Sequence, residues 1–158
     1  MPKNEPKWLN PREMKAWRSY IIASRRLLEA LEQDLDGHDL SMPDYEVLAQ
    51  LSEAPGRRLR MSELAEIAML SKSRLSHRIT VMEKAGWVRR QACTEDKRGS
   101  WAVMTDKGYR AIVKAAPDHV RSVRERFLDR LSAKDQENMA TLFDSIEAGL
   151  REEFKKEA

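Results

Sequence analysis

Residues 71–84 carry a run of small polar and basic side chains whose spacing places them on one face of a helix. With Leu75 as the reference direction and about 100° per residue, Ile79 and Met82 fall on the same side and predict the buried face. The opposite face then holds hydroxyl, imidazole and guanidinium groups, from Ser73, Arg74, Ser76, His77 and Thr80. Such groups hydrogen-bond to base edges in the major groove, and an arginine binds guanine with two hydrogen bonds. We interpret the first four as candidates for reading DNA bases.

The start of the same helix is suited to bind phosphate. Ser71 is placed as the N-cap residue, and a helix N-terminus presents free N–H groups and the positive end of its dipole. We expect Ser71, Lys72 and Arg78 to contact backbone phosphates, with Arg57 and Arg58 as further candidates. The alternative is an ordinary solvated surface, since polar outward faces are common on helices.

The elements that must position these groups follow from capping residues and periodicity. A capping residue precedes each predicted helix, at Asn10, Ser41, Ser62, Ser71, Thr105 and Ser132. The first helix is expected to run to about Asp36, with Gly37 as its C-cap. The stretch EAPGRR predicts a turn, and Pro117 is expected to kink the long helix over 106–131. The two short helices around residue 70 have the spacing of a helix-turn-helix.

The segment EDKRGSW, residues 95–101, lies between two roughly alternating stretches, WVRRQAC and SWAVMT, which predict a β-hairpin. A helix-turn-helix followed directly by a hairpin is a winged helix, whose tip can reach the minor groove. Lys97 and Arg98 are the candidate groove contacts. Asp96 is expected to turn inward and support Arg98 or the hairpin backbone.

The positive charge of the chain is concentrated in its centre. The whole chain has a net charge of +3, whereas residues 57–98 alone carry eleven bases and five acids. The remainder is therefore acidic. This distribution predicts a polyanionic partner for the middle of the chain.

Several functional classes are disfavoured by the sequence. It has no glycine-rich phosphate loop, no nucleophile elbow and no convincing carboxylate pair, so we expect no enzyme and no cofactor. One cysteine and three scattered histidines lack the spacing of a metal site. Without an apolar run of membrane-spanning length or a signal peptide, a cytoplasmic location and no membrane partner are expected.

The segment from Arg60 to Gly108 resembles the MarR family of transcription regulators. The resemblance rests on the order of the two short helices and the hairpin, on the sequence DKR at Asp96–Arg98, and on MTDKG at the start of the next helix. It implies a mainly α fold with a small β-hairpin wing, made of a winged helix-turn-helix lobe and a helical dimerisation domain. The family often has an acid at the position of Thr80, paired with the wing arginine. Its absence here makes Asp96 the expected partner of Arg98.

The resemblance also implies a homodimeric repressor that binds a pseudo-palindromic site in double-stranded DNA and is released by a small effector. We expect an N-terminal helical dimerisation arm over 1–40, the DNA-binding lobe over 41–105, and C-terminal helices that complete the dimerisation domain over 106–158. The apolar stripe from Met139 to Phe154 fits a dimerisation surface, or a face buried within one chain.

Relatives of this kind often bind a small aromatic or phenolic effector between the lobe and the helical domain. Trp17, Tyr20, His38 and Tyr45 are the candidates for such a pocket, since apolar walls with a few polar tips suit a ligand site. Trp17 and Tyr20 also fit the apolar stripe of the first helix, and we expect them in the core.

Two alternatives to this reading remain open. A winged-helix lobe can bind a protein instead of DNA, which would require an apolar patch on the face that carries Arg74 and His77. Cys93 would serve an oxidant-sensing regulator if Arg89 and Arg90 lowered its pKa, although a lone cysteine in a strand is more often a packed residue.

Overall fold

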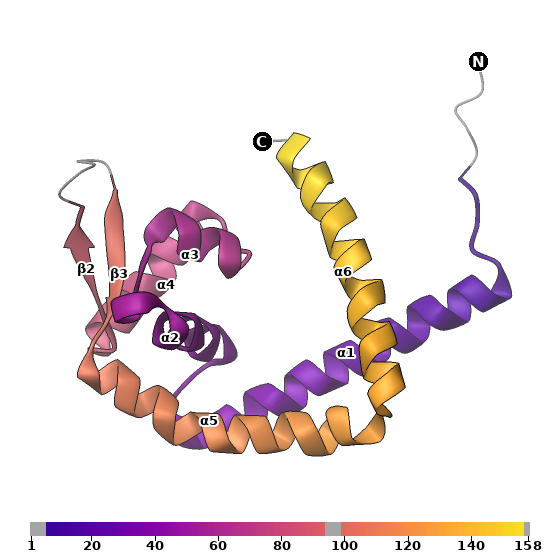
Figure 1. Ribbon diagram of the computed structural model, residues 1–158, viewed down its shortest axis with the longest axis horizontal. Coiled ribbons are helices and arrows are strands. Elements are labelled where there is room, and N and C mark those ends of the chain that lie inside the picture. Colours follow the sequence, from indigo (N-terminus) through magenta and orange to yellow (C-terminus); the bar gives the residue numbers. More distant parts are fainter. Residues whose placement is uncertain (1–5, 94–98, 157–158) are drawn as a thin grey trace. The chain divides into compact units, whose positions relative to one another are not determined.

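The computed structural model describes residues 6–93 and 99–156, with side chains as far as Glu153 (Figure 1). The chain divides into two compact units, Met1–His119 and Val120–Ala158. The elements are, in order, α1 (Pro11–Leu35), a 3-10 turn (Asp36–His38), α2 (Met42–Glu53), a 3-10 turn (Pro55–Arg57), β1 (Arg58–Arg60), α3 (Met61–Ile67), α4 (Lys72–Lys84), β2 (Val88–Ala92), β3 (Ser100–Met104), α5 (Asp106–Arg126), a 3-10 turn (Leu128–Arg130) and α6 (Ala133–Lys156). In the described part of the chain, no helix combines the length and apolar character needed to span a bilayer.

Reciprocal capping bonds fix the start of α1. The side chain of Asn10 accepts from the Glu13 amide at 3.0 Å, and the Glu13 carboxylate accepts from the Asn10 amide at 2.9 Å, which confirms the predicted capping box. The expected C-cap at Gly37 is wrong. Gly37 lies inside the 3-10 turn, and the left-handed residue that ends the turn is Asp39, with φ of 57°, because an aspartate tolerates that conformation.

The two short helices form the predicted helix-turn-helix, but α3 begins differently than expected. Its N-cap is Arg60, and Ser62 lies in its first turn without a capping bond. The strand before it explains the shift, since β1 delivers extended backbone directly into the helix. Met69 in the turn adopts a left-handed φ of 51°, and Ser71 then caps α4 as predicted, accepting from the Arg74 amide at 3.3 Å.

The sheet has three strands in the order β1-β3-β2, all antiparallel. The hairpin of β2 and β3 was predicted, whereas β1 was not, and its first residue, Arg58, was expected to end a turn. Its three residues are too few to show alternation, and it forms because Arg58, Leu59 and Arg60 pair with Val103, Ala102 and Trp101 of β3. Leu59 and Ala102 are buried in the core.

One buried core holds the first unit together. Leu75, Ile79 and Met82 of α4 are fully buried, as the sequence predicts, against α2, α3 and the sheet. The expectation that Trp17 and Tyr20 are core residues is wrong for the isolated chain. They are 54% and 48% exposed, because helical periodicity identifies an apolar face but not what covers it.

The start of α5 is fastened to the turn between α4 and β2. Thr105 caps α5 as predicted, accepting from the Gly108 amide at 3.1 Å, and its hydroxyl donates to the Gly86 carbonyl at 2.6 Å. Lys107 Nζ donates to the Ala85 carbonyl at 2.6 Å. Gly108 packs so closely that a Cβ there would collide with the carbonyl oxygen of Trp87.

The second unit contains the end of α5 and all of α6. Helix α5 includes Pro117 and ends at Arg126, five residues earlier than predicted. Ser132 caps the start of α6 through reciprocal bonds with Asp135. The apolar stripe of α6 is largely uncovered within one chain, with exposed Leu142, Phe143, Ile146 and Leu150.

Candidate nucleic-acid interface

The outward face of α4 is polar and accessible. Ser73, Arg74, Ser76 and His77 are all exposed, on the side of the helix opposite its buried residues. The only acid in α4 is Glu83, and its carboxylate is held by Arg90. The exposed face therefore combines hydrogen-bond donors and acceptors with positive charge, which is the chemistry needed to contact base edges and phosphates.

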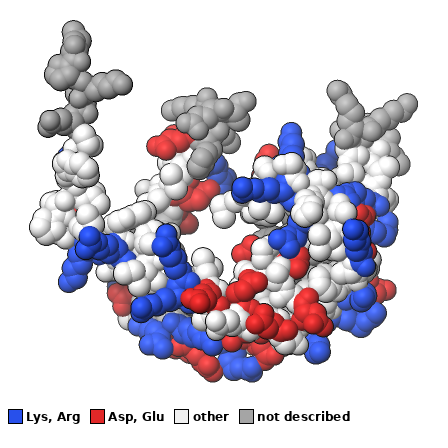
Figure 2. Space-filling view, turned by 180° about the vertical axis from the view of Figure 1, so that it is seen from behind, with Lys and Arg blue, Asp and Glu red and all other residues white. Residues whose placement is uncertain are grey.

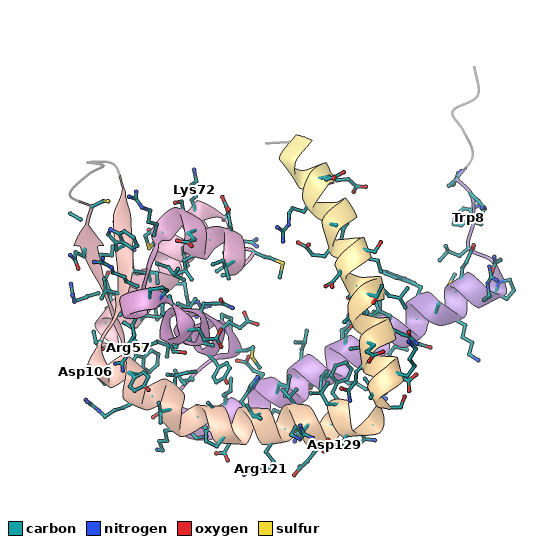
Figure 3. All side chains as sticks on the ribbon, in the orientation of Figure 1. Trp8, Arg57, Lys72, Asp106, Arg121 and Asp129 are labelled. Atoms are coloured by element: carbon teal, nitrogen blue, oxygen red, sulfur yellow. The ribbon has the colours of Figure 1, made fainter. Side chains whose placement is uncertain are left out.

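Ser71 and Lys72 lie at the N-terminal end of this helix. Both are exposed, and the Lys72 side chain points outward from the start of α4 (Figure 3). Ser71 Oγ lies 3.2 Å from Ser73 Oγ, so the two hydroxyl groups form a pair at the helix terminus. The arrangement leaves the first amides of α4 directed at solvent, where an anion is favoured.

The structure places Arg78 against another helix. Its Nη1 lies 3.2 Å from Asp44 Oδ1 and 3.4 Å from Ser41 Oγ, at the start of α2. Asp44 is buried and also closes the capping box of α2. Arg78 therefore sets the position of α4 on α2, and a phosphate contact would require it to leave this ion pair.

Arg90 holds a contact network that sequence reasoning missed. From β2 its Nη2 donates to the Ser76 carbonyl at 2.7 Å and to Thr80 Oγ1 at 3.1 Å, while its Nη1 pairs with Glu83. The Glu83 carboxylate also accepts from the Arg90 amide at 2.8 Å. This network fastens the base of the hairpin to the face of α4. The available signal was Thr80 itself, a polar residue where related proteins place a partner for an arginine.

A basic cleft lies between the start of α3, α4 and the loop end of the hairpin. It has a volume of about 380 Å³, and its lining includes Arg60, Lys72 and Arg90 with the hydroxyl groups of Ser62, Ser76 and Ser100. Figure 2 shows Lys and Arg atoms gathered over the lobe that carries β2 and β3. Asp96, Lys97 and Arg98, the candidate wing residues, lie outside the described residues.

Arg57 and Arg58 occupy different environments. The Arg57 guanidinium lies 3.4 Å from the centre of the Tyr109 ring and 3.6 Å from Asp106, at the start of α5 (Figure 3). Arg58 is exposed, with its guanidinium 4.8 Å from the centre of the Trp101 ring. Arg57 thus joins the sheet to α5, whereas Arg58 remains accessible to a ligand.

The four candidate effector residues are not brought together. Trp17 and Tyr20 form one ring pair near the start of α1, with centroids 6.3 Å apart. The rest of α1 lies between this ring pair and His38. At a helical rise of about 1.5 Å per residue, that part of the helix is roughly 20 Å long. An effector site built from all four within one chain is therefore not present.

His38 and Tyr45 instead lie beside two residues of α5 that the sequence did not single out. His38 Nε2 is 2.8 Å from Asp118 Oδ2, and the Tyr45 and His119 rings are 4.2 Å apart. Burial lowers the pKa of His119, partly opposed by Asp34, and raises the pKa of Tyr45. Within the described part of the chain, the buried Nδ1 atoms of both histidines have no hydrogen-bond partner.

The remaining candidate, Cys93, is 8% exposed at the end of β2. Among the residues that the structure describes, no group of three or more His, Cys, Asp or Glu side chains converges as a metal site.

Comparison with known proteins identifies the family. Residues 40–100 match the MarR family. The transcriptional regulator HosA of Escherichia coli O127:H6 is 36% identical over 99 residues, which cover 63% of this chain and 71% of HosA. The solved structure of AbsC, a MarR family transcriptional regulator from Streptomyces coelicolor, matches with a TM-score of 0.91 and 46% identity over 92% of this chain and 99% of AbsC.

The chain belongs to the MarR family. Sco3205, another MarR family regulator from Streptomyces coelicolor, was solved in complex with DNA and matches with a TM-score of 0.90 and 42% identity over 92% of both chains. The HTH-type transcriptional repressor Rv2887 of Mycobacterium tuberculosis H37Rv is 32% identical over 107 residues, 68% of this chain and 75% of Rv2887. These MarR family relatives are named as regulators of transcription rather than enzymes, and this chain is a transcription regulator of the same kind.

Proposed function

We propose that this protein is a homodimeric repressor that binds a pseudo-palindromic site in double-stranded DNA. The observation that carries the proposal is the exposed polar face of α4, whose only acid is neutralised by Arg90 and whose opposite face is fully buried in the core. The DNA complex of Sco3205 and the name of Rv2887 support DNA binding and repression in this family. We call α4 the recognition helix from here on.

Each candidate residue takes a role that its position suits. Ser73, Arg74, Ser76 and His77 read bases from the exposed face of the recognition helix. Ser71 and Lys72 bind phosphate at its N-terminus, where the free amides add their own donors. In the hairpin loop, Lys97 and Arg98 enter the minor groove and Asp96 supports Arg98.

The uncovered apolar side chains support a homodimer. Helix α6 exposes four large apolar residues, and α1 exposes Trp17, Tyr20, Ile22 and Leu28. An isolated chain rarely leaves so much apolar surface in water, and a second copy of the chain would bury it. The proposed division is then a dimerisation arm over 1–40, a DNA-binding lobe over 41–105 and C-terminal dimerisation helices over 106–158. Two lobes related by a two-fold axis would contact half-sites about 34–36 Å apart.

Release by an aromatic or phenolic effector is the regulatory part of the proposal. Within one chain, His38 and Tyr45 with Asp118 and His119 offer polar and ring contacts where α2 meets α5. A ligand that bound these residues better in one arrangement of the lobes would shift the population toward that arrangement.

The experiment that tests DNA recognition is selection of bound sequences from random duplexes at a fixed salt concentration near physiological. The expected result is an enriched inverted repeat with half-sites about 10 bp apart. A variant with Arg74→Ala and His77→Ala should lose this enrichment, and the matched control Arg110→Ala with Lys134→Ala should keep it. Binding without an enriched sequence, or no binding by folded protein, would contradict the proposal. The second outcome would favour a protein partner.

A further inference from the structure

The three-stranded sheet has one face that is basic along its whole width. Directly paired residues in antiparallel strands point to the same side of a sheet. Arg58 and Arg89 both pair with Val103, and Arg60 and Gln91 both pair with Trp101. Three arginines from two strands therefore share one face with Trp101. No strand of this sheet contains an acid.

This outer face lies on the opposite side of the sheet from the recognition helix. The pairs on the inner side join Leu59 and Ala102 of the core with Arg90, whose guanidinium reaches Ser76 and Thr80. Arg58 and Arg89 point to the other side of the sheet, away from the half-site that this helix would contact. Arg60 has the same strand orientation but also lines the basic cleft beside Lys72 and Ser76.

The guanidinium groups of the outer face are held in place by neutral partners. Those of Arg58 and Arg60 lie 4.8 and 5.2 Å from the centre of the Trp101 ring, and Arg89 donates to Gln91 Oε1 at 3.3 Å. Val103 between them is only 8% exposed. Stacking on an indole ring orders an arginine while leaving its N–H groups available.

None of these three arginines forms an ion pair with a carboxylate among residues 6–93 and 99–153. Other arginines of the same unit do form such pairs, namely Arg57 with Asp106, Arg78 with Asp44, and Arg90 with Glu83. The paired arginines stabilise the fold. The three arginines of the outer face keep a charge that an external anion can bind. Planar guanidinium groups in a fixed array are well matched to phosphate oxygens.

We propose that the outer face of the sheet, formed by Arg58, Arg60, Arg89 and Trp101, binds the phosphate backbone of duplex DNA beyond the hairpin. This inference rests on the proposed function, which places the hairpin tip in the minor groove at the edge of the operator. Among the paired rows of the outer face, the row of Arg60, Trp101 and Gln91 lies nearest the hairpin loop. The phosphates of DNA that flanks the operator offer the matching charge without any base sequence requirement.

The test compares two duplexes that carry the selected operator. One ends at the outer edge of the half-sites, and the other is extended by about one helical turn of arbitrary sequence at each end. Affinity is measured over a range of salt concentrations for the unaltered protein, for Arg58→Gln with Arg89→Gln, and for the control Arg110→Gln with Lys134→Gln. Arg110 and Lys134 are exposed and lie outside the sheet.

The expected result is that the unaltered protein and the control bind the extended duplex more tightly than the short one, whereas the sheet variant binds both equally. On the extended duplex the slope of log affinity against log salt concentration should be shallower for the sheet variant by about 2, because each phosphate contact contributes about 0.9. On the short duplex the slopes should agree.

Three results would overturn the inference while leaving the proposed function intact. The first is equal binding of both duplexes by the unaltered protein, and the second is an equal loss on both duplexes in the sheet variant. The third is a retained preference for extended DNA in the sheet variant, which would leave an acidic protein as the occupant to examine. If the unaltered protein fails to bind the short operator duplex, the proposed function itself is wrong.

Discussion

Arg90 of β2 donates to Thr80 of α4 across 3.1 Å, and this contact helps to hold the hairpin against the recognition helix. The sequence prediction that Arg98 pairs with Asp96 concerns residues outside those that the structure describes. Thr80 is part of a network in which Arg90 also binds Glu83 and the Ser76 carbonyl. The orientation of the hairpin base is thus set by an arginine in the strand itself.

Arg90→Ala should loosen the hairpin from the recognition helix. The change leaves Glu83 and Thr80 without their shared donor, and we expect the free energy of unfolding to fall by about 2 kcal/mol. Urea denaturation measures the loss, with the exposed neighbour Arg89→Ala as the control expected to stay within about 0.5 kcal/mol. Equal stabilities for the two variants would mean that the network contributes nothing measurable.

Arg74→Ala should relax sequence preference at one base pair of each half-site. If Arg74 binds guanine with two hydrogen bonds, its loss lowers the discrimination there by about 1–3 kcal/mol. Competition between the operator and single-substitution variants measures this difference. A uniform decrease in affinity for every sequence would assign Arg74 to the phosphate backbone instead.

His119 should make the protein less stable as the pH falls. Burial holds the pKa of His119 below its ordinary value of 6.5, so the unfolded chain takes up a proton at a higher pH than the folded chain does. The contribution of this residue is therefore fully present above pH 6.5 and is lost as the pH drops from 6.5 toward the folded pKa. His119→Gln should show a shallower decrease in unfolding free energy between pH 7 and pH 5. A steeper decrease in the variant would refute this sign.

Gly108→Ala should destabilise the junction between the sheet and α5. A Cβ at this position would meet the carbonyl oxygen of Trp87, a backbone atom that cannot move without shifting β2. We expect a cost of about 1–3 kcal/mol. Gly37→Ala is the matched control, since nothing lies within 4 Å of its Cβ position. Thermal unfolding of the two variants side by side gives the comparison.

Leu142→Glu with Ile146→Glu should convert the proposed dimer into monomers. Both side chains are more than half exposed in the single chain, so the charges cost little there but would be buried in a dimer. Sedimentation velocity should show the loss of the dimer, whereas the control Ser145→Glu should preserve it. A dimer that survives the double change must use another surface.

The sequence was sufficient for those features that depend on neighbouring residues. The capping bonds at Asn10, Ser41, Ser71 and Ser132 were predictable because each involves residues three positions apart. The buried face of α4 was predictable because helical geometry alone places Leu75 with Ile79 and Met82.

Features that depend on distant residues were not predictable from the same patterns. The strand β1 exists only because β3, some forty residues later, offers it a partner. The network of Arg90 joins a strand to a helix face, and the pairing of His119 with Tyr45 joins α5 to α2. Sequence reasoning placed Trp17 in the core because an exposed apolar stripe and a buried one have the same period.

The attachment of α5 also has a mechanical consequence. A single residue, Thr105, separates β3 from α5. Its bonds to Gly86 and Gly108 make the connection between the sheet and the helix rigid. The sheet and the first turns of α5 are therefore expected to move as one rigid body. Farther along α5, Pro117 has no N–H to donate to the Val113 carbonyl, so the helix is easier to bend there. A small rotation of this rigid body about the Pro117 region would displace the hairpin, which lies far from the axis, by a larger distance.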